Sequence, residues 1–321
     1  MQKFMNLCLA LLALCAAQVP AWAQYPDRPV RILVGAAAGG PTDIVARVLG
    51  DSLGKGLGKP VLVDNRAGAG GNIASQAVAT SAADGYTLLM GSFSNAVNPA
   101  MMAVGYDARR DLMPVSQITR VPLLVVTGKG APFATLGELV AEARKRPGAF
   151  NIASGGIGSS SHMAAELFKR MAGVDMPVIH YKGGAPALQD VLAERVQLMF
   201  DNPQTSLPHV KAGGLKLLAV STAARLRELP NTPTVAEGAG FTGFEVISWH
   251  GIFARSGTPP EVVGRLTREI AAATSGKDLR DRFAQMEIEP VGSTPDEFGR
   301  FFAREMDVWA RIVKEANIKP E

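Results

Sequence analysis

The sequence predicts an α/β protein of two domains, each built on a mostly parallel sheet that helices cover. The chain has 321 residues, of which 47% are apolar and 19% charged, so it can form two cores at about 150 residues per domain. Short β-rich runs alternate with segments of helical periodicity, which is the pattern of helix-covered parallel sheets. The segment 250–321 is mainly helical in pattern and too poor in strands for a third sheet.

Two α/β units follow one another along the chain. The first has expected strands at 30–34, 61–63 and 87–90, with helices at 44–53 and 72–80. The second has expected strands at 123–126, 152–153, 178–179, 196–200 and 215–220, with helices at 136–146, 160–171, 186–193 and 203–211.

The end of the chain is expected to return to the first unit. A short strand at 251–254 precedes a helix that Pro259 and Pro260 open, and a long terminal helix follows. This arrangement predicts a discontinuous domain 1 (24–122 plus 250–321) and an inserted domain 2 (123–249). Neither crossing has a Gly/Ser linker, which favours two short hinge strands beside a cleft.

The N-terminus has the three parts of a secretory signal peptide. Lys3 supplies the positive charge, residues 7–17 are apolar, and the sequence Ala-Trp-Ala at 21–23 is a cleavage site. We therefore expect residues 1–23 to be removed and Gln24 to begin an exported protein. Both cysteines lie in the removed segment, so the product would have no disulfide and no thiolate metal ligand. Lipidation of Cys15 is the alternative, but Leu14 is bulky where a lipoprotein signal has a small residue.

The charges argue against a nucleic-acid or membrane-surface partner. The chain has 33 Lys plus Arg and 29 Asp plus Glu, and the basic residues form no run or stripe.

Two glycine-rich loops lie between an expected strand and an expected helix. The first spans 34–43 (Val-Gly-Ala-Ala-Ala-Gly-Gly-Pro-Thr-Asp), and the second spans 153–162 (Ala-Ser-Gly-Gly-Ile-Gly-Ser-Ser-Ser-His). Bare backbone N–H groups at such a helix start would bind an anion. Neither loop contains lysine or arginine, so one or two carboxylates fit better than a polyanion. The alternative is that the glycines only make turns and the polar residues cap helices.

The remaining motifs give weaker evidence for a functional site. The match to G-x-S-x-G at 50–54 lacks the preceding strand that a hydrolase elbow needs. The histidines, His162, His180, His209 and His250, lack metal-ligand spacing, and each is expected at the surface or at a helix start. Asp201 and Asn202 follow an expected strand, where they would either line a cleft or form a turn. Trp249 is expected to be a buried aromatic near a hinge.

Several segments together resemble a known family, the solute-binding proteins of tripartite tricarboxylate transporters, or Bug-type receptors. The resemblance extends over nearly the whole mature chain, and its segments are in the family's order. They are 39–43 (GGPTD), 64–72 (DNRAGAGGN), 84–89 (DGYTLL), 154–162, 181–183 (YKG) and 233–237 (PTVAE).

The resemblance implies a type II periplasmic-binding-protein fold, a Venus flytrap of two domains that close on a ligand. It implies a periplasmic receptor without catalytic activity, which delivers a small carboxylate to inner-membrane transporter subunits. We expect a monomer without cofactor or metal. The alternatives are a ligand sensor for a histidine kinase and, less favoured, a periplasmic hydrolase or isomerase acting on a carboxylate.

The family's way of holding a carboxylate implies the site residues. They lie in the first loop, in the second loop and on the cleft walls: Ala36, Ala38, Gly39, Gly40, Thr42 and Asp43; Ser154, Gly158, Ser159 and Ser160; and Ser92 and Asp201.

The sequence departs from the family pattern at three positions. Gly35 and Ala36 stand where the family usually has proline and an aromatic residue, and His180 replaces the usual proline before Tyr181. Loss of the aromatic ring would enlarge the pocket, so we expect a bulkier or flatter acid than a four-carbon amino acid, such as an aromatic carboxylate.

Overall fold

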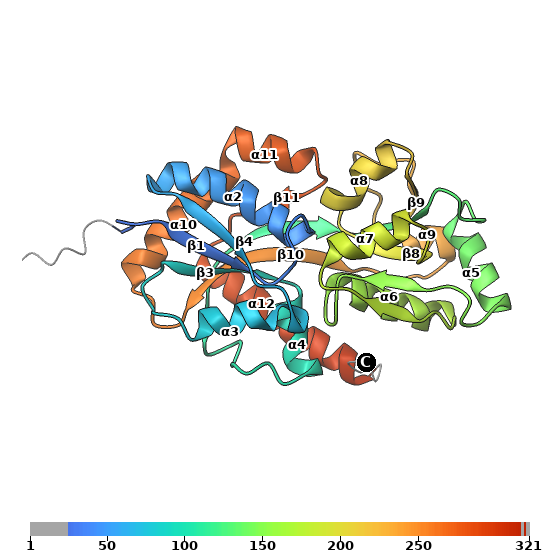
Figure 1. Cartoon of the computed structure of the whole chain (residues 1–321), viewed down its shortest axis with the longest axis horizontal. Helices are drawn as coiled ribbons and strands as arrows, with labels where there is room; N and C mark the ends of the chain where they lie inside the picture. The colour runs from blue at the N-terminus through green and yellow to red at the C-terminus, as the bar shows by residue number, and fades with distance from the viewer. Residues whose placement is uncertain (1–24, 316–317, 319–321) are drawn as a thin grey trace, which may run out of the picture.

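The computed structural model describes residues 25–315 and residue 318. The expected signal peptide lies outside these residues. Two mixed sheets stand side by side along the long axis of the molecule, each between layers of helices (Figure 1). In spatial order the first sheet contains β11 (Glu289–Pro290), β4 (Leu112–Pro122), β10 (Ile247–Arg255), β3 (Thr87–Ser92), β1 (Val30–Val34) and β2 (Val61–Asn65). The second contains β7 (Val178–His180), β6 (Ile152–Ser154), β8 (Leu198–Asp201), β5 (Leu124–Gly128) and β9 (Leu215–Val220).

Helices cover both faces of each sheet. On one face of the first sheet lie α2 (Pro41–Leu57), α10 (Pro260–Ser275) and α11 (Lys277–Ala284). On the other lie η2 (Ala69–Gly71), α3 (Asn72–Ala79), α4 (Ser94–Met101) and α12 (Pro295–Glu315). The second sheet packs against α5 (Leu136–Lys145), α6 (Ser160–Ala172) and α9 (Val235–Ala239) on one side and against α7 (Gly184–Leu192) and α8 (Pro203–Lys211) on the other.

As expected, most strands of each sheet run in one direction: β1, β2, β3 and β4 in the first sheet, and β6, β7, β8 and β9 in the second. β1 pairs in parallel with β2 and β3, and β6 pairs in parallel with β7 and β8. In contrast, β10 is antiparallel to both β3 and β4, and β5 is antiparallel to both β8 and β9. The cause is the path of the chain. β4 runs out of the first sheet into β5, and β10 returns in the opposite sense, so these neighbours need no helical crossover.

The return of the chain to the first sheet is confirmed. β10 lies between β3 and β4, in the middle of the sheet, and α12 packs on α4 and β4. The strand is longer than the expected 251–254, and it includes Trp249, which is buried as expected.

Ser221 ties together the two places where the chain crosses between the sheets. Its hydroxyl accepts a hydrogen bond from Leu123 N at 2.8 Å and donates one to Val246 O at 2.6 Å. Its backbone N–H also donates to Leu123 O at 2.9 Å. The two crossings therefore lie side by side and are held by one buried side chain.

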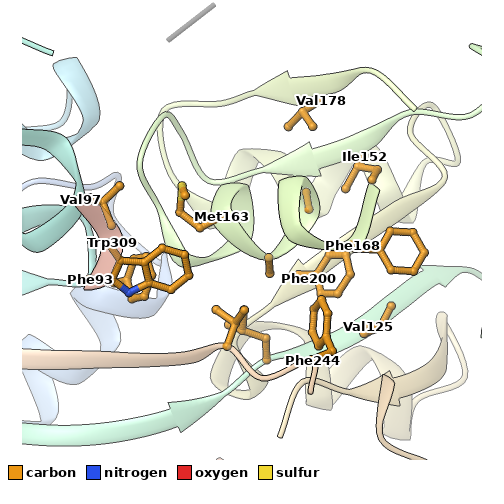
Figure 2. Packing of buried hydrophobic residues seen from close by; sticks show 14 of the residues in the cluster. Phe93, Val97, Val125, Ile152, Met163, Phe168, Val178, Phe200, Phe244 and Trp309 are labelled. Atoms are coloured by element: carbon orange, nitrogen blue, oxygen red, sulfur yellow. The ribbon is translucent and has the colours of Figure 1, made fainter. Parts of the chain in front are cut away.

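One apolar cluster extends from the first unit into the second. Phe93 of α4's N-cap packs edge-on against Trp309 of α12, with ring centroids 4.8 Å apart. Met163 of α6 belongs to the same cluster and lies beside these rings (Figure 2). Farther into the second unit, Phe168 packs against Phe200 at 5.5 Å between centroids. Burial of such rings is a large part of what holds each unit together.

In the described part of the chain, no helix is long and apolar enough to cross a membrane.

Candidate functional site

A cavity of about 350 Å³ lies between the two units. Its walls include residues of both glycine-rich loops, of the carboxyl ends of β3 and β8, and of β10. Strand ends and loops that face each other across two α/β units are the usual place for a ligand in such folds.

Six helices contribute their N-cap or first turn to the wall of this cavity: α2, α6, α7 and α8, together with α3 through Gly71 and α4 through Phe93 and Ser94. The N-cap residues are Gly40 for α2, Ser159 for α6, Gly183 for α7 and Asn202 for α8. No side chain caps α2, α7 or α8, so first-turn N–H groups such as that of Thr42 remain available as donors. The positive dipole ends of several helices around one cavity favour an anion without any buried cationic side chain.

The units touch at the rim of the cavity. Gln204 Nε2 of α8 donates to Pro41 O of α2 at 3.4 Å. A Cβ added to Gly184 would lie only 2.9 Å from Pro41 Cδ, so this close approach requires glycine. The two units are therefore in direct contact beside the cavity.

In the first loop, Ala36 and Thr42 line the cavity. Ala38, Gly39 and Gly40 do not, although they form the turn that leads into α2. The expectation of bare N–H groups is wrong for two residues of this turn, because Gly39 N donates to Asp43 Oδ2 at 2.9 Å and Gly40 N to Ala37 O at 3.2 Å.

Asp43 fixes the loop and does not reach the cavity wall. Its carboxylate is buried and also accepts from Arg47 Nε at 2.9 Å. Burial raises the pKa of Asp43, but the hydrogen bonds from Arg47 and from Gly39 N hold it below the usual value. Asp43 is therefore an ionised partner of Arg47 in the structure.

In the second loop, Ser159 and Ser160 line the cavity, while Ser154 and Gly158 lie behind it. Ser154 Oγ is 2.8 Å from His180 Nδ1 and accepts from Gly156 N at 3.2 Å. Ser159 Oγ accepts from His162 N at 3.2 Å, as a helix cap does. Many polar groups of this loop are thus already used in hydrogen bonds that fix the loop's own conformation.

Gly158 meets the first unit at α4. Its backbone N–H donates to His162 Nδ1 at 3.1 Å, and a Cβ at this position would lie 1.9 Å from Asn98 Oδ1. Gly158 is therefore part of the contact between the units.

The two remaining expected residues, Ser92 and Asp201, both line the cavity. Ser92 ends β3, and its N–H donates to Asn95 Oδ1 at 2.9 Å. Asp201 ends β8 and is 1% exposed, and its Oδ2 accepts from Thr205 Oγ1 at 2.6 Å. Burial raises the pKa of Asp201 to about 7, against the opposing effect of the Thr205 hydroxyl and Asn202 N–H.

Asn202 is a further donor beside Asp201. It lines the cavity and is 7% exposed, and its buried Nδ2 has no hydrogen-bond partner among the described residues. A buried unpaired amide is costly, so a ligand oxygen that accepts from Nδ2 would be favoured.

Two histidines line the cavity, which the sequence did not indicate. His250 is in the middle of β10 and not at the surface, with Nδ1 2.9 Å from Thr119 Oγ1 and Nε2 3.4 Å from Thr42 Oγ1. Burial lowers the pKa of His250 to about 3, so it is neutral. His180, next to Tyr181 and the exposed Lys182, forms part of the opposite wall, and its departure from the family's proline was the available signal.

The loop 68–71 completes the wall on the side of the first unit. A Cβ on Gly35 would lie 2.6 Å from Gly71 Cα, so this loop takes the space beside Gly35. The sequence marked the segment only as a family motif. Apolar side chains line the cavity between the polar ends, namely Leu89, Met90, Phe93, Met102, Ile157 and Met199.

Among residues 25–315 and 318, no group of three or more His, Cys, Asp or Glu side chains is arranged to hold a metal ion.

Comparison with known proteins agrees with this geometry. A family model described as "Tripartite tricarboxylate transporter family receptor" matches residues 45–318. The chain belongs to this receptor family. Protein BugT of Bordetella pertussis is 39% identical to it over 298 residues, which cover 92% of this chain and 91% of BugT.

Solved structures have the same fold as this receptor. The structure of the periplasmic binding protein BugD matches with a TM-score of 0.89 and 33% identity, and the match covers 92% of this chain and all of BugD. The R. palustris protein Rpa4515 with adipate matches with a TM-score of 0.89 and 36% identity, over 92% of this chain and all of that protein. The receptor thus has the two-domain α/β fold of the periplasmic binding proteins in its family, as the sequence resemblance implied.

Proposed function

We propose that this receptor captures a small carboxylate in the periplasm and delivers it to the inner-membrane subunits of a tripartite tricarboxylate-type transporter. The observation that carries the proposal is the presence of several helix N-termini at one cavity between the units. The binding of adipate by the related Rpa4515 supports a carboxylate ligand.

Capture would work by closure of two domains. We propose that residues 24–122 plus 250–321 move against residues 123–249 about the crossings that Ser221 ties together. A ligand that contacts both walls stabilises the closed arrangement, and the permease would recognise that arrangement. We propose that the receptor acts as a monomer after removal of residues 1–23.

The cavity supports binding more than catalysis. Thr42 and His250 could form a nucleophile and base, but the third group is the hydroxyl of Thr119 and not a carboxylate. The low pKa of the buried His250 also makes it a poor base near pH 7. We therefore propose that the protein is not an enzyme.

Thermal unfolding of residues 24–321 tests the ligand class. The panel would contain aliphatic di- and tricarboxylates, acidic amino acids, aromatic acids and the amide of each acid. A ligand at 100 times its dissociation constant should add about 2.7 kcal/mol of stability, which is a shift of several degrees. A shift with an acid but not with its amide supports the proposal. A flat panel, repeated after unfolding and refolding to remove any copurified solute, would refute carboxylate capture.

A further inference from the structure

An acidic side chain faces the cavity where a carboxylate is proposed to bind. Asp201 lines the wall and is 1% exposed, beside Asn202 at the N-terminus of α8. No lysine, arginine or histidine forms an ion pair with Asp201 in the described part of the chain. Its side-chain partner, Thr205 Oγ1, is a neutral hydroxyl.

Two negative charges in this cavity would repel one another. Asp201 is one of the residues that line the cavity of about 350 Å³ in which the ligand carboxylate is proposed to bind. A like charge nearby disfavours the ionised form of a carboxyl group. A proton on one of the two carboxyls removes this repulsion and forms an O–H···O⁻ hydrogen bond, which is among the strong ones.

We infer that Asp201 is protonated in the loaded receptor and donates a hydrogen bond to a carboxylate oxygen of the ligand, so that capture above neutral pH takes up one proton from solvent. This inference rests on the proposed function. The neighbouring Asn202 Nδ2, which lacks a partner, would donate to the same ligand group. Burial already raises the pKa of Asp201 to about 7 in the structure.

The surrounding titratable groups do not replace Asp201 in this role. Those on the cavity wall or on elements packed around Asp201 include His180, Tyr181, Lys182, His250, Asp43, His162, Glu166, Lys169, Arg170, Asp190, His209 and Lys211. Asp43 and Asp190 are paired with Arg47 and Arg195. Burial lowers the pKa of both His162 and His250 to about 3, so neither gains a charge near neutral pH.

The remaining groups are set apart by position or by chemistry. Tyr181 donates to Asp190 at 2.6 Å, and its pKa is raised to about 12 by burial and by that carboxylate. His209 and Lys211 are in the last turn of α8, at the opposite end of the helix from Asp201. Lys182 also lines the cavity, but it is exposed, so water and salt screen its charge. His180 is a competing titratable group on the wall, and the experiment must separate it from Asp201.

Calorimetric titration with adipate, citrate and benzoate, between about pH 6 and about pH 9, tests the inference. The affinity of the native receptor should be constant below about pH 7 and fall up to tenfold per pH unit above it. Titrations in buffers of different ionisation enthalpy should show proton uptake rising from zero toward one per ligand over the same range. The Asp201→Asn variant keeps a donor that cannot titrate, so it should bind with an affinity independent of pH and take up no proton.

Control variants identify the titrating group. Asp175→Asn, which changes an exposed carboxylate far from the cavity wall, should keep the native pH profile. Loss of the pH dependence in His180→Gln but not in Asp201→Asn would overturn the inference. Affinity that is flat with pH, or that rises with pH, would overturn it as well and leave the proposed function intact.

Two further cases are a complete absence of binding and failure of the Asp201→Asn variant to fold. Absence of binding by these acids and by the whole thermal-shift panel at every pH would overturn the proposed function and the inference together. If Asp201→Asn fails to fold, infrared difference spectra of the native receptor at about pH 8 decide: a protonated carboxyl band that appears on loading supports the inference, and its absence refutes it.

Discussion

Adding one methyl group at Gly158 should weaken ligand binding by opposing closure of the two units. Gly158 has a φ of 71°, and its added Cβ would lie 1.9 Å from Asn98 Oδ1 and 3.1 Å from Asn98 Cγ. Asn98 is 1% exposed, and its Nδ2 donates to Gly70 O at 2.9 Å and to Asn72 Oδ1 at 3.2 Å. The Asn98 side chain can therefore make room only by giving up these bonds.

The size of the effect follows from those two hydrogen bonds. Each contributes about 1 kcal/mol, so Gly158→Ala should disfavour the closed arrangement by about 2 kcal/mol. Because the clash exists only where the second loop meets α4, this cost falls on the ligand-bound form, and the affinity should drop about 30-fold. The left-handed backbone adds about 1 kcal/mol of strain to open and closed forms alike, so it cancels in the affinity.

Gly173→Ala is the matched control. Gly173 has a φ of 60° at the C-cap of α6, and a Cβ there would have no atom within 4 Å. This variant should lose about 1 kcal/mol of stability and keep native affinity, as measured by urea unfolding and calorimetric titration with the tightest acid of the panel. Native affinity in Gly158→Ala would refute the reasoning, because it would mean that the loop and α4 do not meet when ligand is bound.

Three further changes have distinct expected results. Ala36→Phe places an aromatic ring in a cavity of about 350 Å³ and should reduce affinity in calorimetric titration, whereas unchanged binding would contradict an enlarged pocket. The raised pKa of Asp201, about 7 in the folded protein, means that the unligated native protein loses stability as pH rises from about 4 to about 7, by up to about 4 kcal/mol. Denaturant unfolding of Asp201→Asn should lack that loss, and parallel pH profiles of the two proteins would show that Asp201 is not the cause. Phe168→Ala removes a fully buried ring and should cost about 3–5 kcal/mol in urea unfolding, with a smaller loss indicating that the core collapses around the site.

The sequence predicted those elements that have a clear local pattern. Residues 30–34 form a buried strand and residues 203–211 a helix, as expected from a run of β-branched residues and from Pro203 at a helix start. The long strand β4 (Leu112–Pro122) was missed, because Ser116 and Thr119 are fully buried polar residues that break the apolar pattern. The antiparallel direction of β10 was not predicted, since direction depends on where the chain re-enters the sheet and no local pattern records it.

The candidate site could likewise be predicted only where it depends on the local sequence. Glycine-rich turns before helices are local features, so Thr42, Ser159 and Ser160 could be expected near the cavity. His250 could not, because it lies in the middle of a strand and reaches the cavity only through pairing of β10 with β3. Which loop N–H groups are already bonded, such as that of Gly39, also depends on a side chain four positions away in the folded turn.

Different residues of the cavity would determine the charge and the shape of the bound ligand. Helix N-termini and neutral donors act on any carboxylate, so they set the charge of the ligand and not its shape. Shape is set by the apolar wall between the polar ends, where Phe93 is held by Trp309 in an edge-on contact and cannot easily move aside. Ala36 is the one alanine of the first loop that lines the cavity, and Gly71 lies against Gly35, so we expect the ligand's bulk to be sensed at Ala36. A change of ligand preference should therefore follow from substitutions at Ala36 and Phe93, whereas substitutions at the helix starts should weaken all acids together.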